Sequence, residues 1–156
     1  MSNLPEIEQS APNFRADNSK EDSIKLADYL GKWLVLYFYP KDNTPGCTTE
    51  AQNFSELKEQ FTQLNAQIVG VSPDSVKSHQ KFIDKRELTI ELLSDPEHRI
   101  AEDYGIWGLK KFMGKEYMGI IRSTFLINPE GKIAQIWFPV KVKGHAEAVL
   151  DYLKTL

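Results

Sequence analysis

The chain has 156 residues and a formal net charge of −3, from 19 basic and 22 acidic residues that form no block of one sign. This length fits one domain, residues 1 to 156, which can bury roughly 70% of its unfolded surface without a disulfide or a metal. The charge pattern argues against nucleic acid and anionic membranes as partners, and no run reaches the roughly 18 apolar residues of a membrane span. The N-terminal segment MSNLPEIEQS lacks the basic start and apolar centre of a signal peptide, so we expect a cytoplasmic protein.

The N-terminal part of the chain predicts a small β extension. Residues 1 to 10 are polar and predict a lead-in without regular structure. Residues 11 to 31 read as two short extended pieces around an Asp-Asn-Ser turn, followed by a helical turn before Gly31. We expect the two extended pieces to be edge strands.

A buried strand and a helix come next. Residues 33 to 39 are seven consecutive apolar or aromatic residues, typical of a strand buried on both faces, and Pro40 ends the strand because proline has no N–H. Thr44 can cap a helix whose first position is Pro45, and apolar residues then recur every three or four positions. Cys47, the only cysteine, therefore falls in the first turn of a helix.

The position of Cys47 predicts a reactive thiol. Unpaired N–H groups and the positive end of the helix dipole favour the thiolate, which is the nucleophilic form. A lone cysteine can also be a small buried apolar residue, but the neighbours of Cys47 are small or carry hydroxyl groups, and Gly46 leaves room for an approaching group. One cysteine forms no internal disulfide, and the histidines show no ligand-like spacing with it. We therefore expect no metal and no cofactor.

The middle of the chain continues as an alternation of strands and helices. The expected elements are a buried strand over residues 66 to 71, a helix opened by residues 72 to 74 and ending near Arg86, a strand over residues 91 to 94, and a helix capped by Asp95 and ended by Gly105. Such alternation with short loops predicts parallel strands joined by right-handed crossovers.

The last third predicts a connecting segment, a hairpin and a helix. Residues 106 to 121 contain three glycines without a clean period and predict a long connection, which is either a loop packed by its own aromatics or a wall of the active-site pocket. Residues 123 to 128 and 132 to 138 predict an antiparallel hairpin with Arg122 at its mouth, and an apolar stripe over residues 146 to 153 predicts a helix that covers the sheet. This order indicates an α/β, thioredoxin-like fold with an N-terminal β extension and a long insertion before the C-terminal hairpin.

Several segments together resemble one family. Pro40, Thr44 and Cys47 form the motif P-x-x-x-T-x-x-C, and Arg122 opens the segment RSTFLI 75 residues after the cysteine. With YFYPKDNTPGCTTEAQNF, GVSPDS, MGIIRSTFLINPEGK and VKVKGHAEAVL, nearly the whole chain resembles the peroxiredoxin Q, or bacterioferritin comigratory protein, subfamily of the peroxiredoxins. The resemblance implies a thiol-dependent peroxidase for hydrogen peroxide and organic hydroperoxides, acting in cell redox homeostasis as a monomer or weak homodimer.

The resemblance also implies roles for individual residues. Cys47 is the peroxidatic cysteine, Thr44 and Arg122 complete its site, and Pro40 limits access of solvent to it. Thiolate attack on an O–O bond requires donors for the departing oxygen, which Arg122 and the backbone N–H groups can supply. Glu50, one turn after Cys47, can orient Arg122. From the residues alone, Arg122 also fits a surface charge at a strand end and Thr44 fits a simple helix cap.

The chain departs from the subfamily at the resolving cysteine. Members of the subfamily often carry this second cysteine five residues after the first or in the following helix, but here those places hold Gln52 and a helix without cysteine that includes Ile83. The sulfenic acid formed on Cys47 would then be reduced by an external thiol such as thioredoxin, glutaredoxin or glutathione. We therefore expect a one-cysteine mechanism.

Two other functional classes are compatible with a single reactive cysteine. A thioredoxin-fold redox sensor would pass its oxidation to a partner protein through a mixed disulfide, and would differ from an enzyme by stopping after one equivalent of peroxide. A Cys-His hydrolase would need a histidine base beside Cys47, whereas His79, His98 and His145 are more simply interpreted as surface or capping residues.

Overall fold

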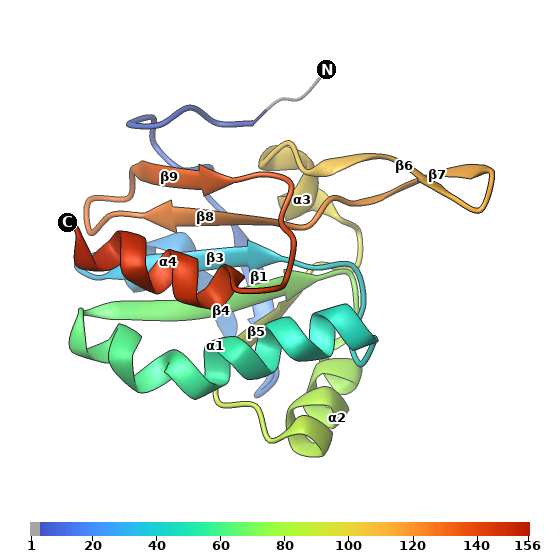
Figure 1. Ribbon diagram of the computed structural model, residues 1–156, viewed down its shortest axis with the longest axis horizontal. Coiled ribbons are helices and arrows are strands. Elements are labelled where there is room, and N and C mark those ends of the chain that lie inside the picture. Colours follow the sequence, from blue (N-terminus) through green and yellow to red (C-terminus); the bar gives the residue numbers. More distant parts are fainter. Residues whose placement is uncertain (1–3) are drawn as a thin grey trace.

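A seven-stranded sheet forms the centre of the protein, whose structure is a computed structural model describing residues 4–156 (Figure 1). Within these residues, no helix is long and apolar enough to cross a membrane. The elements are β1 (Arg15–Asn18), β2 (Ser23–Lys25), a 3-10 helix η1 (Leu26–Tyr29), β3 (Trp33–Phe38), α1 (Pro45–Gln63), β4 (Ala66–Ser72), α2 (Val76–Arg86), β5 (Glu91–Ser94), α3 (Arg99–Asp103), β6 (Trp107–Phe112), β7 (Lys115–Ile120), β8 (Ser123–Ile127), β9 (Ile133–Trp137) and α4 (His145–Lys154).

The order of the strands is β2-β1-β5-β4-β3-β8-β9. Strands β3, β4 and β5 are parallel, as the β-α-β-α alternation predicts, and β8 and β9 form the predicted antiparallel hairpin beside β3. The thioredoxin-like α/β fold with an N-terminal β extension is thereby confirmed. One detail of the prediction is wrong: of the two N-terminal strands, only β2 lies at an edge of the sheet, because β1 pairs with β5 on its other side.

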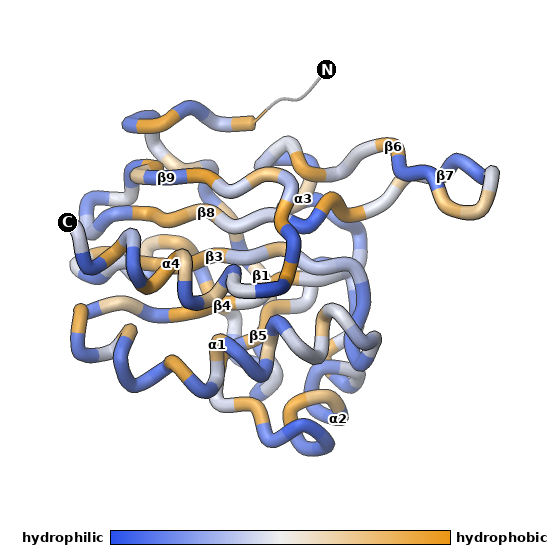
Figure 2. The backbone as a smooth tube through the Cα atoms, viewed as in Figure 1, coloured by the Kyte–Doolittle hydropathy of each residue, from blue (hydrophilic) through white to orange (hydrophobic). Residues whose placement is uncertain are grey.

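Strand β3 is buried on both faces and divides the core into two clusters. Leu34, Leu36 and Phe38 point into the cluster that contains η1 and α3. Val35 and Tyr37 point into the cluster that α1 and α4 cover. Figure 2 shows apolar residues concentrated in the central strands and hydrophilic residues along much of α1 and α2. This double burial explains the uninterrupted apolar sequence of the strand.

The segment predicted as a long connection is instead a two-stranded hairpin, β6–β7, that extends away from the main sheet (Figure 1). Its strands pair from Trp107 and Ile120 out to Phe112 and Lys115. The two residues between them, Met113 and Gly114, both have positive φ, as a tight hairpin turn requires. Since both faces of this arm are largely exposed, burial imposes no alternation of apolar and polar residues, and the strand pattern is missing from the sequence.

Two helix starts differ from the predicted ones. Helix α2 begins after Ser75, whose hydroxyl caps it, because Ser72 still belongs to β4 and the Asp74 carboxylate bonds a neighbouring loop. Helix α3 has His98 at its N-cap position. The Asp95 carboxylate still accepts hydrogen bonds from two N–H groups of the first turn of α3, so its capping role is confirmed.

Candidate active site

Cys47 lies in the first turn of α1. Figure 1 shows that α1 follows β3 by a loop at the end of the sheet where β3 finishes. Pro45 is the first helical residue, and the N–H of Thr48 bonds the carbonyl of Thr44 at 2.8 Å, which closes the first turn. This turn contains no acidic residue, so its N–H groups and the helix dipole remain available to an anion at Cys47. Cys47 as a whole is almost completely buried, at 1% exposure.

Arg122 reaches Cys47 because of the sheet topology. Ser123, the first residue of β8, pairs with Phe38, the last residue of β3. Arg122 therefore lies next to the point where the chain leaves β3 towards α1, and the N–H of Val140 bonds its carbonyl oxygen at 2.8 Å. Its Nη2 donates a hydrogen bond to Cys47 Sγ at 3.3 Å.

Glu50 holds the other side of the same guanidinium. Arg122 Nη1 donates to Glu50 Oε1 at 2.6 Å, and Glu50 is 1% exposed. Burial raises the pKa of Glu50 to about 7, although Arg122 acts in the opposite direction. Burial would lower the pKa of Arg122, but Glu50 and Cys47 outweigh it and raise that pKa. The guanidinium is thus a fixed cation that presents one nitrogen to the sulfur.

Gly46 leaves room for Arg122. A Cβ atom at this position would lie 3.3 Å from Arg122 Nη2 and 4.0 Å from Val142 Cγ2. The sequence predicted that Gly46 leaves room for a group approaching Cys47. In the structure, the guanidinium of Arg122 occupies this space. A side chain at position 46 would push this group away from the sulfur.

Thr44 and Pro40 flank the loop that joins β3 to α1. Thr44 occupies the N-cap position, with φ −93° and ψ 157°, but its hydroxyl makes no capping hydrogen bond. It donates instead to the carbonyl of Lys41 at 2.8 Å. The oxygen of Thr44 therefore has lone pairs left to accept a hydrogen bond. Both Thr44 and Pro40 are half-buried.

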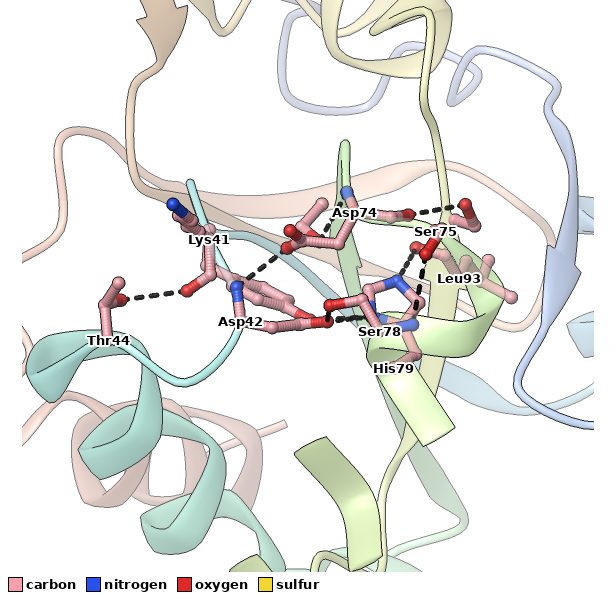
Figure 3. A network of polar contacts seen from close by, with 11 residues as sticks. Lys41, Asp42, Thr44, Asp74, Ser75, Ser78, His79 and Leu93 are labelled. Atoms are coloured by element: carbon pink, nitrogen blue, oxygen red, sulfur yellow. Dashed lines mark hydrogen bonds and ion pairs between the residues drawn. The ribbon is translucent and has the colours of Figure 1, made fainter. Parts of the chain in front are cut away.

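A buried polar network fixes this loop to α2 and β5 (Figure 3). Asp42 Oδ2 lies 2.7 Å from His79 Nδ1 and accepts from the Ser78 hydroxyl at 2.7 Å, while its Oδ1 accepts from Tyr39 at 2.5 Å. His79 Nε2 lies 3.0 Å from the carbonyl of Leu93. His79 has no exposed surface, so the prediction of a surface or capping residue is wrong, because both of its nitrogens find partners inside the protein.

A carbonyl only accepts, so His79 Nε2 carries a hydrogen that it donates to Leu93, while His79 Nδ1 faces the Asp42 carboxylate. Asp42, Asp74 and His79 offer atoms within 4.8 Å of one another that could ligate a metal. The Asp74 carboxylate, however, already accepts from the Asp42 N–H and the Ser72 hydroxyl. These contacts make the cluster a brace between the loop and α2.

Replacing His79 by leucine should lower the free energy of unfolding by about 3 kcal/mol, because the variant leaves the Asp42 carboxylate buried beside an apolar group. Urea unfolding of the two proteins measures the difference. Lys81→Leu, at an exposed position of the same helix, is the control and should stay within about 0.5 kcal/mol of the wild type. Equal stabilities of the two variants would contradict the bracing role.

His98 and His145 do not form a hydrogen bond with Cys47 either. His145 is 6% exposed, its Nε2 lies 2.7 Å from the Thr124 hydroxyl, and burial lowers its pKa to about 4. The prediction of a surface or capping residue is therefore wrong for His145, which is buried and bonds a residue of β8. His98 is at the N-cap position of α3 and stacks on Trp107 at 3.7 Å. Within residues 4–156, no histidine nitrogen bonds Cys47, so the arrangement that a Cys-His hydrolase needs is missing from this part of the chain.

Comparison with known proteins identifies close relatives. Residues 7–136 match the AhpC/TSA family. Peroxiredoxin Bcp of Bacillus subtilis (strain 168) is 52% identical over 151 residues, which cover 97% of this chain and 96% of that protein. Peroxiredoxin Bcp of Escherichia coli (strain K12) is 37% identical over 92% of both chains.

Solved structures agree with this likeness. A cysteine-to-serine mutant of peroxiredoxin Q from Xylella fastidiosa is 43% identical and superposes with a TM-score of 0.93, covering 99% of this chain and 98% of that one. Bacterioferritin comigratory protein of Xanthomonas campestris, studied for its alkyl peroxide reduction activity, is 41% identical with a TM-score of 0.88 over 99% and 98% of the two chains.

Proposed function

We propose a one-cysteine mechanism for this chain, which belongs to the AhpC/TSA family and is a thiol-dependent peroxidase. The observation that carries the proposal is the hydrogen bond of 3.3 Å from Arg122 Nη2 to Cys47 Sγ, made in a chain with no other cysteine. This contact combines a cation with the first turn of a helix, and both stabilise a thiolate.

The first step is attack of the Cys47 thiolate on one oxygen of the hydroperoxide. An S–O bond forms and the O–O bond breaks, so the sulfur becomes a sulfenic acid and the other oxygen leaves with the electron pair. That oxygen takes a proton from solvent and departs as water or an alcohol. Arg122 stabilises the negative charge as it moves from sulfur to oxygen, and Glu50 keeps the guanidinium oriented during the transfer.

Thr44 and Pro40 act on the peroxide before it reacts. Because the Thr44 hydroxyl donates its hydrogen to the carbonyl of Lys41, it can only accept from the peroxide O–H. This acceptor orients the peroxide so that the oxygen carrying this hydrogen faces Cys47 and the other oxygen is the one that leaves. Pro40, at the start of the loop, adds no N–H group to the site and shields it from water.

The second step needs a thiol from outside the chain. Gln52 in α1 and Ile83 in α2 stand where a resolving cysteine would be expected. An external thiolate attacks the sulfenic sulfur, which releases water and forms a mixed disulfide, and a second thiol then frees Cys47. Since Cys47 is 1% exposed, we expect the first turn of α1 to open locally before a protein reductant such as thioredoxin or glutaredoxin, or the smaller glutathione, can react.

The test is multiple-turnover consumption of hydrogen peroxide and of tert-butyl hydroperoxide with excess dithiothreitol. Sustained turnover, and a mixed disulfide at Cys47 detected by mass spectrometry when glutathione replaces dithiothreitol, are the expected results. Parallel assays with thioredoxin and glutaredoxin rank the natural reductants. Consumption that stops after one equivalent of peroxide would reject enzymatic cycling and favour a redox sensor that transfers its oxidation to a partner protein.

A further inference from the structure

The β6–β7 arm concentrates the exposed apolar side chains of the protein. Within residues 4–156, eight large hydrophobic side chains are exposed, and five of them lie on this arm: Leu109, Phe112, Met113, Tyr117 and Met118. Phe112 and Met113, at the tip, are 66% and 86% exposed. Figure 1 shows the arm projecting away from the sheet, which leaves its tip open to the surroundings. An exposed apolar cluster of this kind marks a surface that contacts another molecule or a membrane.

The apolar side chains lie on both faces of the arm. Residues that pair across an antiparallel hairpin share a face, and the faces alternate along each strand. Leu109 pairs with Met118 on one face. Tyr117, one position before Met118, and Phe112, three positions after Leu109, therefore lie on the opposite face. A flat protein partner would cover only one of these faces, whereas a lipid bilayer surrounds an inserted tip on all sides.

The arm is also positively charged. It carries Lys110, Lys111 and Lys115 against a single acidic residue, Glu116, which pairs with Lys111 at 3.7 Å. Within residues 4–156, neither Lys110 nor Lys115 forms an ion pair. The overall net charge of −3, which argues against a membrane partner, does not reveal this local excess. Lysines interleaved with exposed aromatic and aliphatic side chains are typical of segments that lie in the interface of anionic bilayers.

Two further lysines lie near the base of the arm. Lys141 and Lys143 are exposed in the loop between β9 and α4. The N–H of Val140, at the start of this loop, bonds the carbonyl of Arg122, which follows β7 by two residues. This end of the molecule therefore presents a positive surface around a projecting apolar tip. Two copies docked arm to arm would bring like charges together, so the charge favours an anionic surface over a second copy.

The length of the arm suits shallow insertion. From the pair Trp107–Ile120 to the pair Phe112–Lys115, the arm extends about 17 Å, and interfacial segments enter a bilayer by about 5–10 Å. Within the described residues, β6 and β7 form a sheet of two strands, so their outer edges keep unpaired backbone groups. These groups need water and restrict the arm to the interface. With the tip at that depth, the lysines lie at the level of the lipid phosphates.

We propose that the β6–β7 arm anchors the protein reversibly to anionic lipid bilayers. Phe112 and Met113 insert between the lipid head groups, and the lysines of the arm pair with lipid phosphates. An apolar tip of two side chains with a few lysines gives reversible binding rather than permanent insertion. The proposal goes beyond the proposed peroxidase function and does not depend on it.

The experiment is flotation of the protein with vesicles, without peroxide or thiol. One set of vesicles contains equal parts of phosphatidylglycerol and phosphatidylcholine, and the other contains phosphatidylcholine alone. We expect the wild type to bind the anionic vesicles at least about fivefold more tightly, and about 0.5 M salt to release it. The double variant Phe112→Ser, Met113→Ser should lose at least about tenfold in affinity. Lys111→Gln with Lys115→Gln should lose about 25-fold, since each lysine contributes about fivefold.

Lys154→Gln with Leu156→Ser is the matched control, because it removes an exposed lysine and an exposed apolar side chain from the C-terminal end of the chain. Figure 1 shows this end on the opposite side of the molecule from the arm, so the control should bind like the wild type. Equal binding by the tip variant and the wild type would overturn the proposal. A wild type that binds neither vesicle, but whose size in solution falls with the tip variant, would overturn it in favour of a second copy.

Peroxide consumption separates this proposal from the peroxidase function. The tip variant should consume hydrogen peroxide at the wild-type rate, which also shows that it is folded. Loss of vesicle binding together with loss of this activity would indicate a damaged fold and would contradict the assignment of an independent anchor. A wild type that binds anionic vesicles but consumes no peroxide would reject the peroxidase function and leave the anchor supported.

Discussion

Replacing Cys47 by serine should reduce multiple-turnover peroxide consumption to the uncatalysed level, a loss of at least about 10³-fold. The serine hydroxyl stays protonated at neutral pH, so the nucleophile disappears although Arg122 and the helix N-terminus remain in place. Since the side chain is buried and nearly the same size as cysteine, the fold should persist. The result would identify the sulfur as the reacting atom.

The assay uses excess dithiothreitol, with circular dichroism and thermal unfolding as checks on the fold. Thr49→Ser, at an exposed position of the same helical turn, is a suitable control and should retain wild-type turnover. Peroxide consumption by a folded Cys47→Ser protein at the wild-type rate would refute the proposed mechanism. The same variant should also fail to form a mixed disulfide with glutathione.

Arg122→Gln should lower the rate constant for oxidation by hydrogen peroxide by about 10² to 10³, the usual cost of removing one donor that stabilises developing negative charge. Glutamine is neutral and too short to reach both the sulfur and Glu50. The variant also leaves the Glu50 carboxylate buried without its cation, so we expect a lower thermal stability as well. Stopped-flow measurement of the oxidation step, with reduced protein and no added thiol, isolates this effect from the reductive step.

A lysine variant at position 122 tests whether the rate depends on the position of the guanidinium nitrogens or only on the positive charge. Arg122 bonds Cys47 through Nη2 and Glu50 through Nη1, and the single ammonium of lysine cannot hold both contacts in the same geometry. Arg122→Lys should therefore recover only a small part of the lost rate. Arg99→Gln, which removes an exposed arginine paired only with Glu97, is the control. Full activity of Arg122→Lys would show that charge alone is sufficient.

Residues that are close in the sequence made the thiol site predictable. The apolar run before Pro40, the N-cap position of Thr44 and Pro45 at the first helical position are all local signals, and the structure has β3 and α1 where these signals predict them. The position of Cys47 in the first turn of α1 follows from them directly. The roles of Thr44 and Pro40 in catalysis remain predictions.

Prediction from local sequence signals failed for segments that are not buried and for residues that are buried by distant parts of the chain. In the β6–β7 arm, both faces are largely exposed, so residues 107 to 120 show no alternation and their hairpin was missed. His79 was misjudged because its partners, Asp42 and Leu93, lie 37 and 14 residues away.

The sequence by itself determined the order of most elements, the strand buried on both faces and the place of the only cysteine in the first turn of a helix, because propensity, capping and hydrophobic period act over a few residues. Only the tertiary structure decided which groups surround the sulfur. Antiparallel pairing of β8 with β3 brings Arg122 across 75 residues to Cys47, and the missing side chain of Gly46 allows the final approach. Contacts of this kind depend on strand order and register, which are set by packing of the whole sheet rather than by any short segment.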